Sequence, residues 1–445
     1  MRKNDLEPNE ENLKKSIELN YVNRNQKLAN FIRLLNSINE NYAISLDGEW
    51  GSGKTFFILQ LLYLHNHGII DNLKQYKTDI ETFKNTYVPI YYNAWEHDDH
   101  NDPLESLTSI VLLEYSKPGT FLKKKGNDLS AALKEVLSNL AETLTGGLLT
   151  KEVTKKATTG FKEYIENVEK LENRKNVVNG LFDDLLKEDK RILLIIDDLD
   201  RSRPDFAVKL LEVIKHFYNN NKITTIVATN NRQLAHSVEH IYGNKTDGYK
   251  YLNRIYDTTI YLQTEITERY MTLCHGIEKD GLCIEQLMEI ICKHFHFSYR
   301  DCNRYVAMYR IVEKYTQGGR FYSSETEDLF RSVILILALA LKIVDASKYD
   351  SFVSGEGEEE LRKFLQYLSV EKNDEYRLFD WLYSAVLHNR DTKLPELSNQ
   401  AKIEEIIKKY GSMFTDKDAW NGISNFKEAV SMLGNAATYQ DESPY

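Results

Sequence analysis

Residues 48–55 have the residue types and the spacing of a phosphate-binding loop. They read Gly-Glu-Trp-Gly-Ser-Gly-Lys-Thr and fit the pattern G-x-x-x-x-G-K-[ST]. Gly51 and Gly53 can take backbone angles that turn consecutive N–H groups toward an anion. Lys54 is expected to reach the β- and γ-phosphates of a nucleoside triphosphate, and Thr55 to ligate Mg²⁺. The pattern therefore predicts a triphosphate site, with a plain glycine turn as the disfavoured alternative.

The chain on either side of this loop has the composition that such a site needs. Residues 42–46 are a short apolar run suited to a buried strand, and residues 55–62 begin an apolar helix. A helix that starts at the loop adds positive potential to the N–H groups. The residues expected to contact the nucleotide are Gly48, Glu49, Trp50, Gly51, Ser52, Gly53, Lys54, Thr55 and Phe56.

An acidic cluster follows a second apolar run, far along the chain. Five apolar residues, 192–196, predict a strand buried on both faces. The acids come at its carboxyl end, where ligands bind in open α/β sheets. Asp197 is the candidate magnesium ligand, and Asp198 is the candidate group that orients or deprotonates the attacking water. Asp200 could take either role, and turn chemistry that favours Asp is the structural alternative for the cluster.

Three further apolar runs, at 87–92, 222–228 and 259–262, complete the expected sheet. They predict an α/β fold with a parallel sheet of five core strands and helices on both faces. Asn230 follows the fourth strand, where a polar residue could sense a γ-phosphate. Its alternative role is to cap the helix that begins near Arg232, and the sequence leaves both roles open.

The composition excludes several classes of protein. Lys and Arg number 57 against 67 Asp and Glu, so the net charge is −10 and nucleic-acid binding is not evident. Four cysteines do not make a disulfide framework, and the first residues are too polar for a signal peptide. The longest apolar run, 333–341, is too short for a membrane span and predicts a core helix. We therefore expect a soluble, cytoplasmic protein without membrane insertion.

Taken together, these residues resemble the KAP family of P-loop NTPases, a branch near the STAND and AAA+ ATPases. The tryptophan-containing loop at 48–55 looks like that family's phosphate loop, and residues 197–201 match its Walker B segment. Asn93-Ala94-Trp95, followed by Pro103 and Leu107, is similar to its second-strand motif. The resemblance covers about residues 20–310 and implies a P-loop NTPase fold that binds ATP and Mg²⁺. Many members carry transmembrane helices between the Walker motifs, and this chain shows none.

Arginines come into the site through the same resemblance. Residues 251–255 look like a variant of the family's Tyr-Leu-Glu-Lys-Ile stretch, and Arg254 is a candidate arginine finger, in cis or from a neighbouring subunit. Residues 300–304 resemble the arginine motif of the helical lid, and Arg300 and Arg304, four residues apart, share one helix face, as a phosphate sensor on the lid requires. An ordinary surface pair and a solvated basic face are the alternatives. Asn230-Asn231 stands where the family often has Asp, and Asn253-Arg254 replaces the family's Glu-Lys.

The resemblance and the helical periodicity together predict four regions. Residues 1–103 and 187–263 form the P-loop core, 104–186 a helical insertion, 264–320 a helical lid and 321–445 a mostly helical C-terminal domain. Apolar stripes in the insertion fit either a helix pair packed on the core or an arm that binds a partner or forms an oligomer.

The expected activity is ATP binding and slow hydrolysis, coupled to a conformational change or to assembly. We expect a homo-oligomer, a protein partner or both. The resemblance implies a role in bacterial signalling or antiphage defence. The alternative is a nucleotide-gated scaffold that does not hydrolyse ATP and presents its helices to a protein partner.

One short pattern favours guanine over adenine. Residues 244–247 read Asn-Lys-Thr-Asp and fit the guanine-reading pattern of GTPases. A guanine reader should directly follow a sheet strand, whereas this stretch follows a predicted helix at about 233–241. GTP therefore remains the less favoured nucleotide.

Four cysteines and their histidine neighbours raise the question of zinc. Their positions are Cys274, Cys283, Cys292 and Cys302, with His275, His294 and His296 nearby. The spacings do not match compact zinc sites, which favours small buried side chains.

Overall fold

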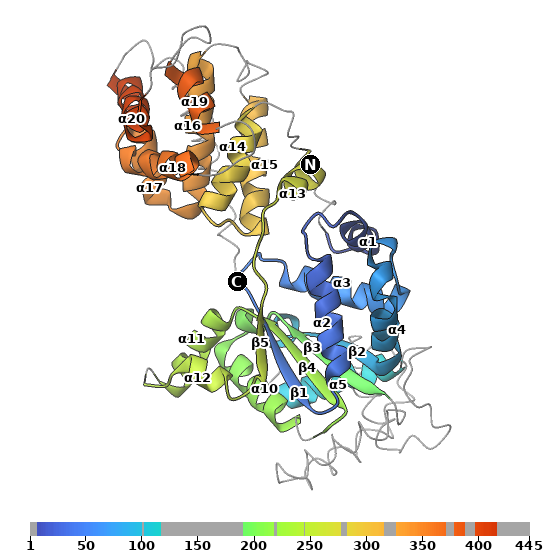
Figure 1. Ribbon diagram of the computed structural model, residues 1–445. Helices are drawn as coiled ribbons and strands as arrows, with labels where there is room; N and C mark the ends of the chain where they lie inside the picture. The colour runs from blue at the N-terminus through green and yellow to red at the C-terminus, as the bar shows by residue number, and fades with distance from the viewer. Residues whose placement is uncertain are drawn as a thin grey trace, which may run out of the picture. The chain divides into compact units, whose positions relative to one another are not determined.

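In the computed structural model, the described residues are 7–99, 102–116, 190–217, 220–243, 245–276, 283–315, 326–370, 378–387 and 397–415 (Figure 1). The chain divides into two compact units. The sheet unit comprises residues 8–20 and 24–263. The helical unit comprises residues 1–7, 21–23 and 264–445.

The sheet unit is built on five parallel strands in the order β2-β3-β4-β1-β5. Their bounds are Tyr42–Asp47 (β1), Tyr87–Asn93 (β2), Arg191–Asp197 (β3), Ile223–Thr229 (β4) and Thr258–Tyr261 (β5). The register aligns Asn93 with Asp197 and Asp47 with Thr229. The carboxyl ends of these strands therefore meet at one edge of the sheet, and the predicted strands are confirmed.

Helices cover both faces of this sheet (Figure 1). One face packs against α1 (Glu10–Leu19), α2 (Asn25–Ser37), α3 (Lys54–His67) and α4 (Lys77–Thr86). The other packs against α5 (Pro103–Ser116), α10 (Pro204–Phe217), α11 (Asn231–Tyr242) and α12 (Gly248–Leu252). Short 3-10 helices are η2 (Asp71–Tyr76), η3 (Trp95–His97) and η4 (Leu199–Arg201). Residues 192–196 alternate between the two cores, which explains why the whole run is apolar. The predicted fold class is confirmed.

The described part of the helical unit consists of helices around one apolar core. They are α13 (Glu268–His275), α14 (Cys283–His294), α15 (Tyr299–Tyr315), α16 (Thr326–Val344), α17 (Ala346–Ser354), α18 (Glu358–Val370), α19 (Leu378–Leu387) and α20 (Asn399–Thr415). Residues 333–341 lie in α16 and are buried throughout, as a core helix requires. None of the helices within the described ranges has both the length and the apolarity to cross a membrane.

The helical insertion remains a prediction. Helix α5 covers its beginning, and residues 117–189 lie outside the described part of the chain. The four predicted regions likewise remain predictions.

Candidate phosphate-binding site

The loop at 48–53 joins β1 to α3. Gly51 and Gly53 have φ values of 81° and 85°, a region that other residues enter only with strain. The N–H of Ser52 donates to the carbonyl of Glu49 at 3.1 Å, and the N–H of Phe57 donates to that of Gly53 at 3.0 Å. The loop therefore runs directly into the first turn of the helix, as the glycine pattern predicts.

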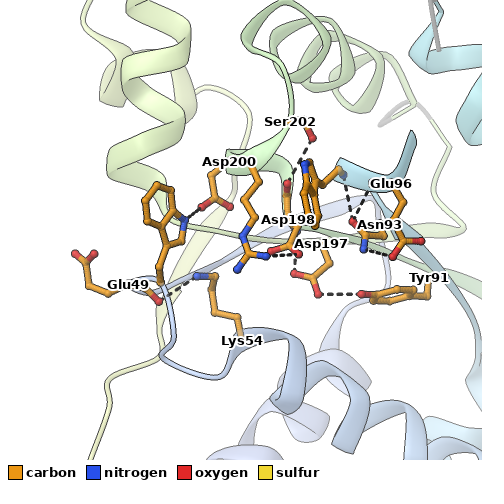
Figure 2. Close-up of polar contacts among 12 residues, drawn as sticks. Glu49, Lys54, Tyr91, Asn93, Glu96, Asp197, Asp198, Asp200 and Ser202 are labelled. Carbon is orange, nitrogen blue, oxygen red and sulfur yellow. Dashed lines mark hydrogen bonds and ion pairs between the residues drawn. The ribbon is translucent and has the colours of Figure 1, made fainter. Parts of the chain in front are cut away.

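Lys54 opens helix α3 and folds back over the loop. Its ammonium group donates to the carbonyl of Gly48 at 2.7 Å. It also donates to the carbonyl of Glu49 at 3.3 Å (Figure 2). Burial lowers the pKa of Lys54, and the nearby carboxylates, Asp200 first, oppose that shift. The Lys54 ammonium group therefore lies inside the loop and is hydrogen-bonded to two neutral carbonyls. Phosphate oxygens are stronger acceptors and would take the place of these carbonyls.

The two candidate magnesium ligands come together. Asp197 is fully buried at the end of β3 and accepts a hydrogen bond from the Tyr91 hydroxyl at 3.0 Å, and the Thr55 hydroxyl is near enough to lower the pKa of Asp197. Burial raises the pKa of Asp197, and the Thr55 and Tyr91 hydroxyls oppose this shift. A carboxylate next to a threonine hydroxyl is an oxygen donor set that suits Mg²⁺.

Asp198 has an unusual backbone. Its φ of 54° lies in the left-handed region, which is uncommon for residues other than glycine and concentrates at functional sites. Its carboxylate accepts from the Arg201 guanidinium at 3.2 Å. Burial raises the pKa of Asp198, the charge of Asp197 adds to this, and Arg201 opposes it. A carboxyl group with a raised pKa is better suited to accept a proton from water.

Asp200 binds the tryptophan of the phosphate loop. The Trp50 indole N–H donates to Asp200 Oδ2, while Asp200 Oδ1 is buried and has no hydrogen-bond partner among the described residues. Trp50 itself is 45% exposed. Asp200 therefore connects the phosphate loop to η4, which follows β3, a contact that the sequence pattern does not predict.

Asn230 caps a helix, one of the two roles that the sequence left open, and also contacts the phosphate loop. Its side-chain oxygen accepts from the backbone N–H groups of Arg232 at 3.1 Å and Gln233 at 3.4 Å, which caps α11. Its amide NH₂ donates to Glu49 of the phosphate loop at 3.0 Å. The cap is observed, and the sensing role remains a prediction.

Tyr91, Asn93 and Glu96 join the site without having been predicted as site residues. The Asn93 amide donates to Glu96 at 2.7 Å, next to the β3 acids (Figure 2). Two signals were available in the sequence: the likeness of Asn93-Ala94-Trp95 to the family's second-strand motif and the polar side chains that follow an apolar run. The position of these residues beside Asp197 depends on the strand register, which neither signal gives.

The remaining predicted site residues are Phe56, Arg254, Arg300 and Arg304. Phe56 is partly buried in the first turn of α3. Arg254 is exposed after α12 in the sheet unit. Arg300 and Arg304 are exposed in α15 of the helical unit. Their contacts with a nucleotide remain predictions.

The two competing patterns gain no support from the described residues. Asn244 lies outside them, and Asp247 caps α12 by accepting from the Lys250 N–H at 3.0 Å. Cys292 and Cys302 are buried in the core of the helical unit, with their sulfur atoms 3.7 Å apart. Within the described ranges, no group of three or more His, Cys, Asp or Glu side chains is placed to hold a metal ion.

Comparison with models of known protein families finds a match. The model of the KAP family P-loop domain matches residues 24–283 of the 445, more than half of the chain. The matched range contains the loop at 48–55, the Walker B acids and the second-strand motif. No curated protein matches the chain. The protein therefore belongs to the KAP family of P-loop NTPases.

Proposed function

We propose that the chain binds ATP with Mg²⁺ in the loop between β1 and α3 and hydrolyses it slowly. One observation supports this most: Lys54, Thr55 and Asp197 converge at the N-terminal turn of α3. A positively charged hydrogen-bond donor at a helix N-terminus suits a phosphate chain, and a hydroxyl next to a carboxylate suits the divalent ion bound to it. The choice of adenine rests on the family.

The residues of the chain then have separate tasks. The backbone N–H groups of the loop bind the phosphates, and Lys54 exchanges its bonds to Gly48 and Glu49 for bonds to phosphate oxygens. Bound Mg²⁺, held by Thr55 and Asp197, would neutralise charge on the β- and γ-phosphates. Asp198 orients the attacking water and accepts its proton. Catalysis of this kind consists of positioning and charge stabilisation, without a covalent intermediate.

The cycle is proposed to drive a conformational change or assembly, with a second copy or another protein as partner. A role in bacterial signalling or antiphage defence follows by analogy with the family only.

One contact favours the second candidate function, a nucleotide-gated scaffold without turnover. Asp198 is paired with Arg201 at 3.2 Å, and a paired carboxylate is a poorer base than a free one. If this pair persists with nucleotide bound, the site binds ATP but does not activate water.

Turnover by the Asp198→Asn variant separates the two functions. We expect phosphate release to fall about 10²–10⁴-fold while MgATP affinity is retained, because the amide cannot accept the proton. Asp205→Asn, a surface acid in the first turn of α10, is the matched control and should leave the rate unchanged. Wild-type turnover no higher than that of Asp198→Asn would favour the scaffold.

A further inference from the structure

Besides the passage at Glu7–Pro8, two short connections carry the chain between the units. Residues 21–23 belong to the helical unit although α1 and α2, on either side, belong to the sheet unit. The chain leaves the sheet unit again after Gln263. Arg24 and Gln263 are therefore the sheet-unit residues at which these connections end.

A single buried side chain links one connection to the other and both to the phosphate loop. Arg24 is 4% exposed, and its Nη2 donates to the carbonyl of Gln263 at 2.7 Å and to that of Ser52 at 2.8 Å. Ser52 lies in the phosphate loop. Arginine suits this position because its planar group offers several fixed donors and stays charged when buried.

The contact with Ser52 acts on the phosphate-binding face of the loop. The carbonyl of Ser52 and the N–H of Gly53 belong to one planar trans peptide, so they point in opposite directions. A guanidinium that holds the carbonyl on one side therefore directs the Gly53 N–H to the other. Any rotation of this peptide on phosphate binding must also move the hydrogen bond to Arg24.

The helical unit fixes the far ends of the same two connections. The Tyr299 hydroxyl donates to the carbonyl of Glu265 at 3.2 Å and lies 3.5 Å from that of Val22. The Thr267 hydroxyl donates to the carbonyl of Tyr21 at 3.3 Å. Each connection is thus hydrogen-bonded at both of its ends. Because the connections are only a few residues long, a displacement of Gln263 is expected to move residues 264–267 as well.

We propose that Arg24 is a positioning residue that couples phosphate binding at Ser52–Gly53 to the connection at Gln263. The proposal rests on the proposed function, because it requires a nucleotide in the loop. Through Arg24, nucleotide binding in the phosphate loop changes the conformation of the first residues of the helical unit after Gln263.

The test is amide hydrogen exchange of residues 260–270, with and without MgATP, in wild type, Arg24→Gln and Arg24→Lys. We expect nucleotide to slow exchange there in the wild type, Arg24→Gln to abolish this response, and Arg24→Lys to restore part of it. Arg24→Gln should also bind MgATP about tenfold more weakly, the effect of losing hydrogen bonds from a charged group. At saturating MgATP the weaker binding no longer matters, so any missing exchange response then reports the loss of coupling.

Arg33→Gln is the matched control. Arg33 lies on the same helix, α2, but is exposed and pairs with Asp79 at 2.7 Å, so its removal should leave the exchange response intact. A full response in Arg24→Gln at saturation would overturn the proposal while the proposed function stands. If Arg24→Gln does not fold, a wild-type response in Arg24→Lys overturns it equally. Absence of nucleotide binding to the wild type would overturn both.

Discussion

The two units bury ionisable groups in opposite ways. The carboxyl edge of the sheet gathers charged groups, with Arg24, Lys54 and Asp197 all below 9% exposure and all hydrogen-bonded. The helical core instead buries groups that burial keeps neutral, such as Tyr305 and Cys292, whose pKa values lie far above their ordinary ones. Buried charge is costly and is concentrated where it can act on a ligand. The comparison indicates that the sheet edge carries the chemistry and that the helical core is structural.

The largest effect tests the helical core. Leu337 lies in α16 and is fully buried, so Leu337→Ala should lower the free energy of unfolding by about 2–5 kcal/mol through a cavity and lost apolar contacts. Chemical denaturation measures this value. Val344→Ala, at an exposed position of the same helix, should change stability by about 0.5 kcal/mol or less. If folded Leu337→Ala lost affinity for MgATP, the helical core would not be purely structural, contrary to the comparison of the two units.

Acid should destabilise the helical unit through His275. Burial, with the Arg310 charge next, lowers the pKa of His275 from 6.5 to about 4. The unfolded chain therefore binds a proton that the folded chain does not. Stability from this group is complete above about pH 6.5 and is lost as the pH falls toward 4, by about 2 kcal/mol at pH 5.

Denaturation of wild type and His275→Gln at pH 7 and pH 5 checks this sign. The histidine chain should lose more stability between the two pH values than the glutamine chain does. Equal losses would mean that His275 is protonated in the folded state, contrary to its buried surroundings.

A smaller effect concerns the sheet edge. Tyr91→Phe removes the hydroxyl that donates to Asp197 at 3.0 Å and should weaken Mg²⁺-dependent ATP binding by about 1 kcal/mol, or roughly fivefold. Titration at several Mg²⁺ concentrations measures it. Tyr63→Phe on α3 serves as the control. An unchanged affinity would show that the hydrogen bond from Tyr91 does not contribute to Mg²⁺ binding by Asp197.

The smallest effect concerns the loop tryptophan. Trp50→Phe removes the bond to Asp200 and should weaken MgATP binding by about 0.5–1 kcal/mol. It should also remove the indole fluorescence change on MgATP binding, because Trp50 lies in the loop itself. Trp95→Phe, another exposed indole, should retain the change. A change that survives in Trp50→Phe would place the moving indole elsewhere.

Local patterns of sequence predicted the strands, the phosphate loop and the α/β fold. The glycines at 51 and 53 and the apolar run 192–196 each determine their structure within a few residues. The contacts between Tyr91 and Asp197, Trp50 and Asp200, and Arg24 and Ser52 could not be predicted in this way. They depend on the strand order and register of distant segments, which no local periodicity encodes.

Calorimetric titration of the wild type and Lys54→Ala with MgATP tests the central claim most directly. The account predicts saturable heat for the wild type and at least about 30-fold weaker binding for Lys54→Ala, because a buried charged contact to phosphate is lost. Lys77→Ala, an exposed lysine of α4, should bind as the wild type does. Folded wild-type protein that gives no heat with MgATP, or a Lys54→Ala variant that binds equally well, would contradict the account.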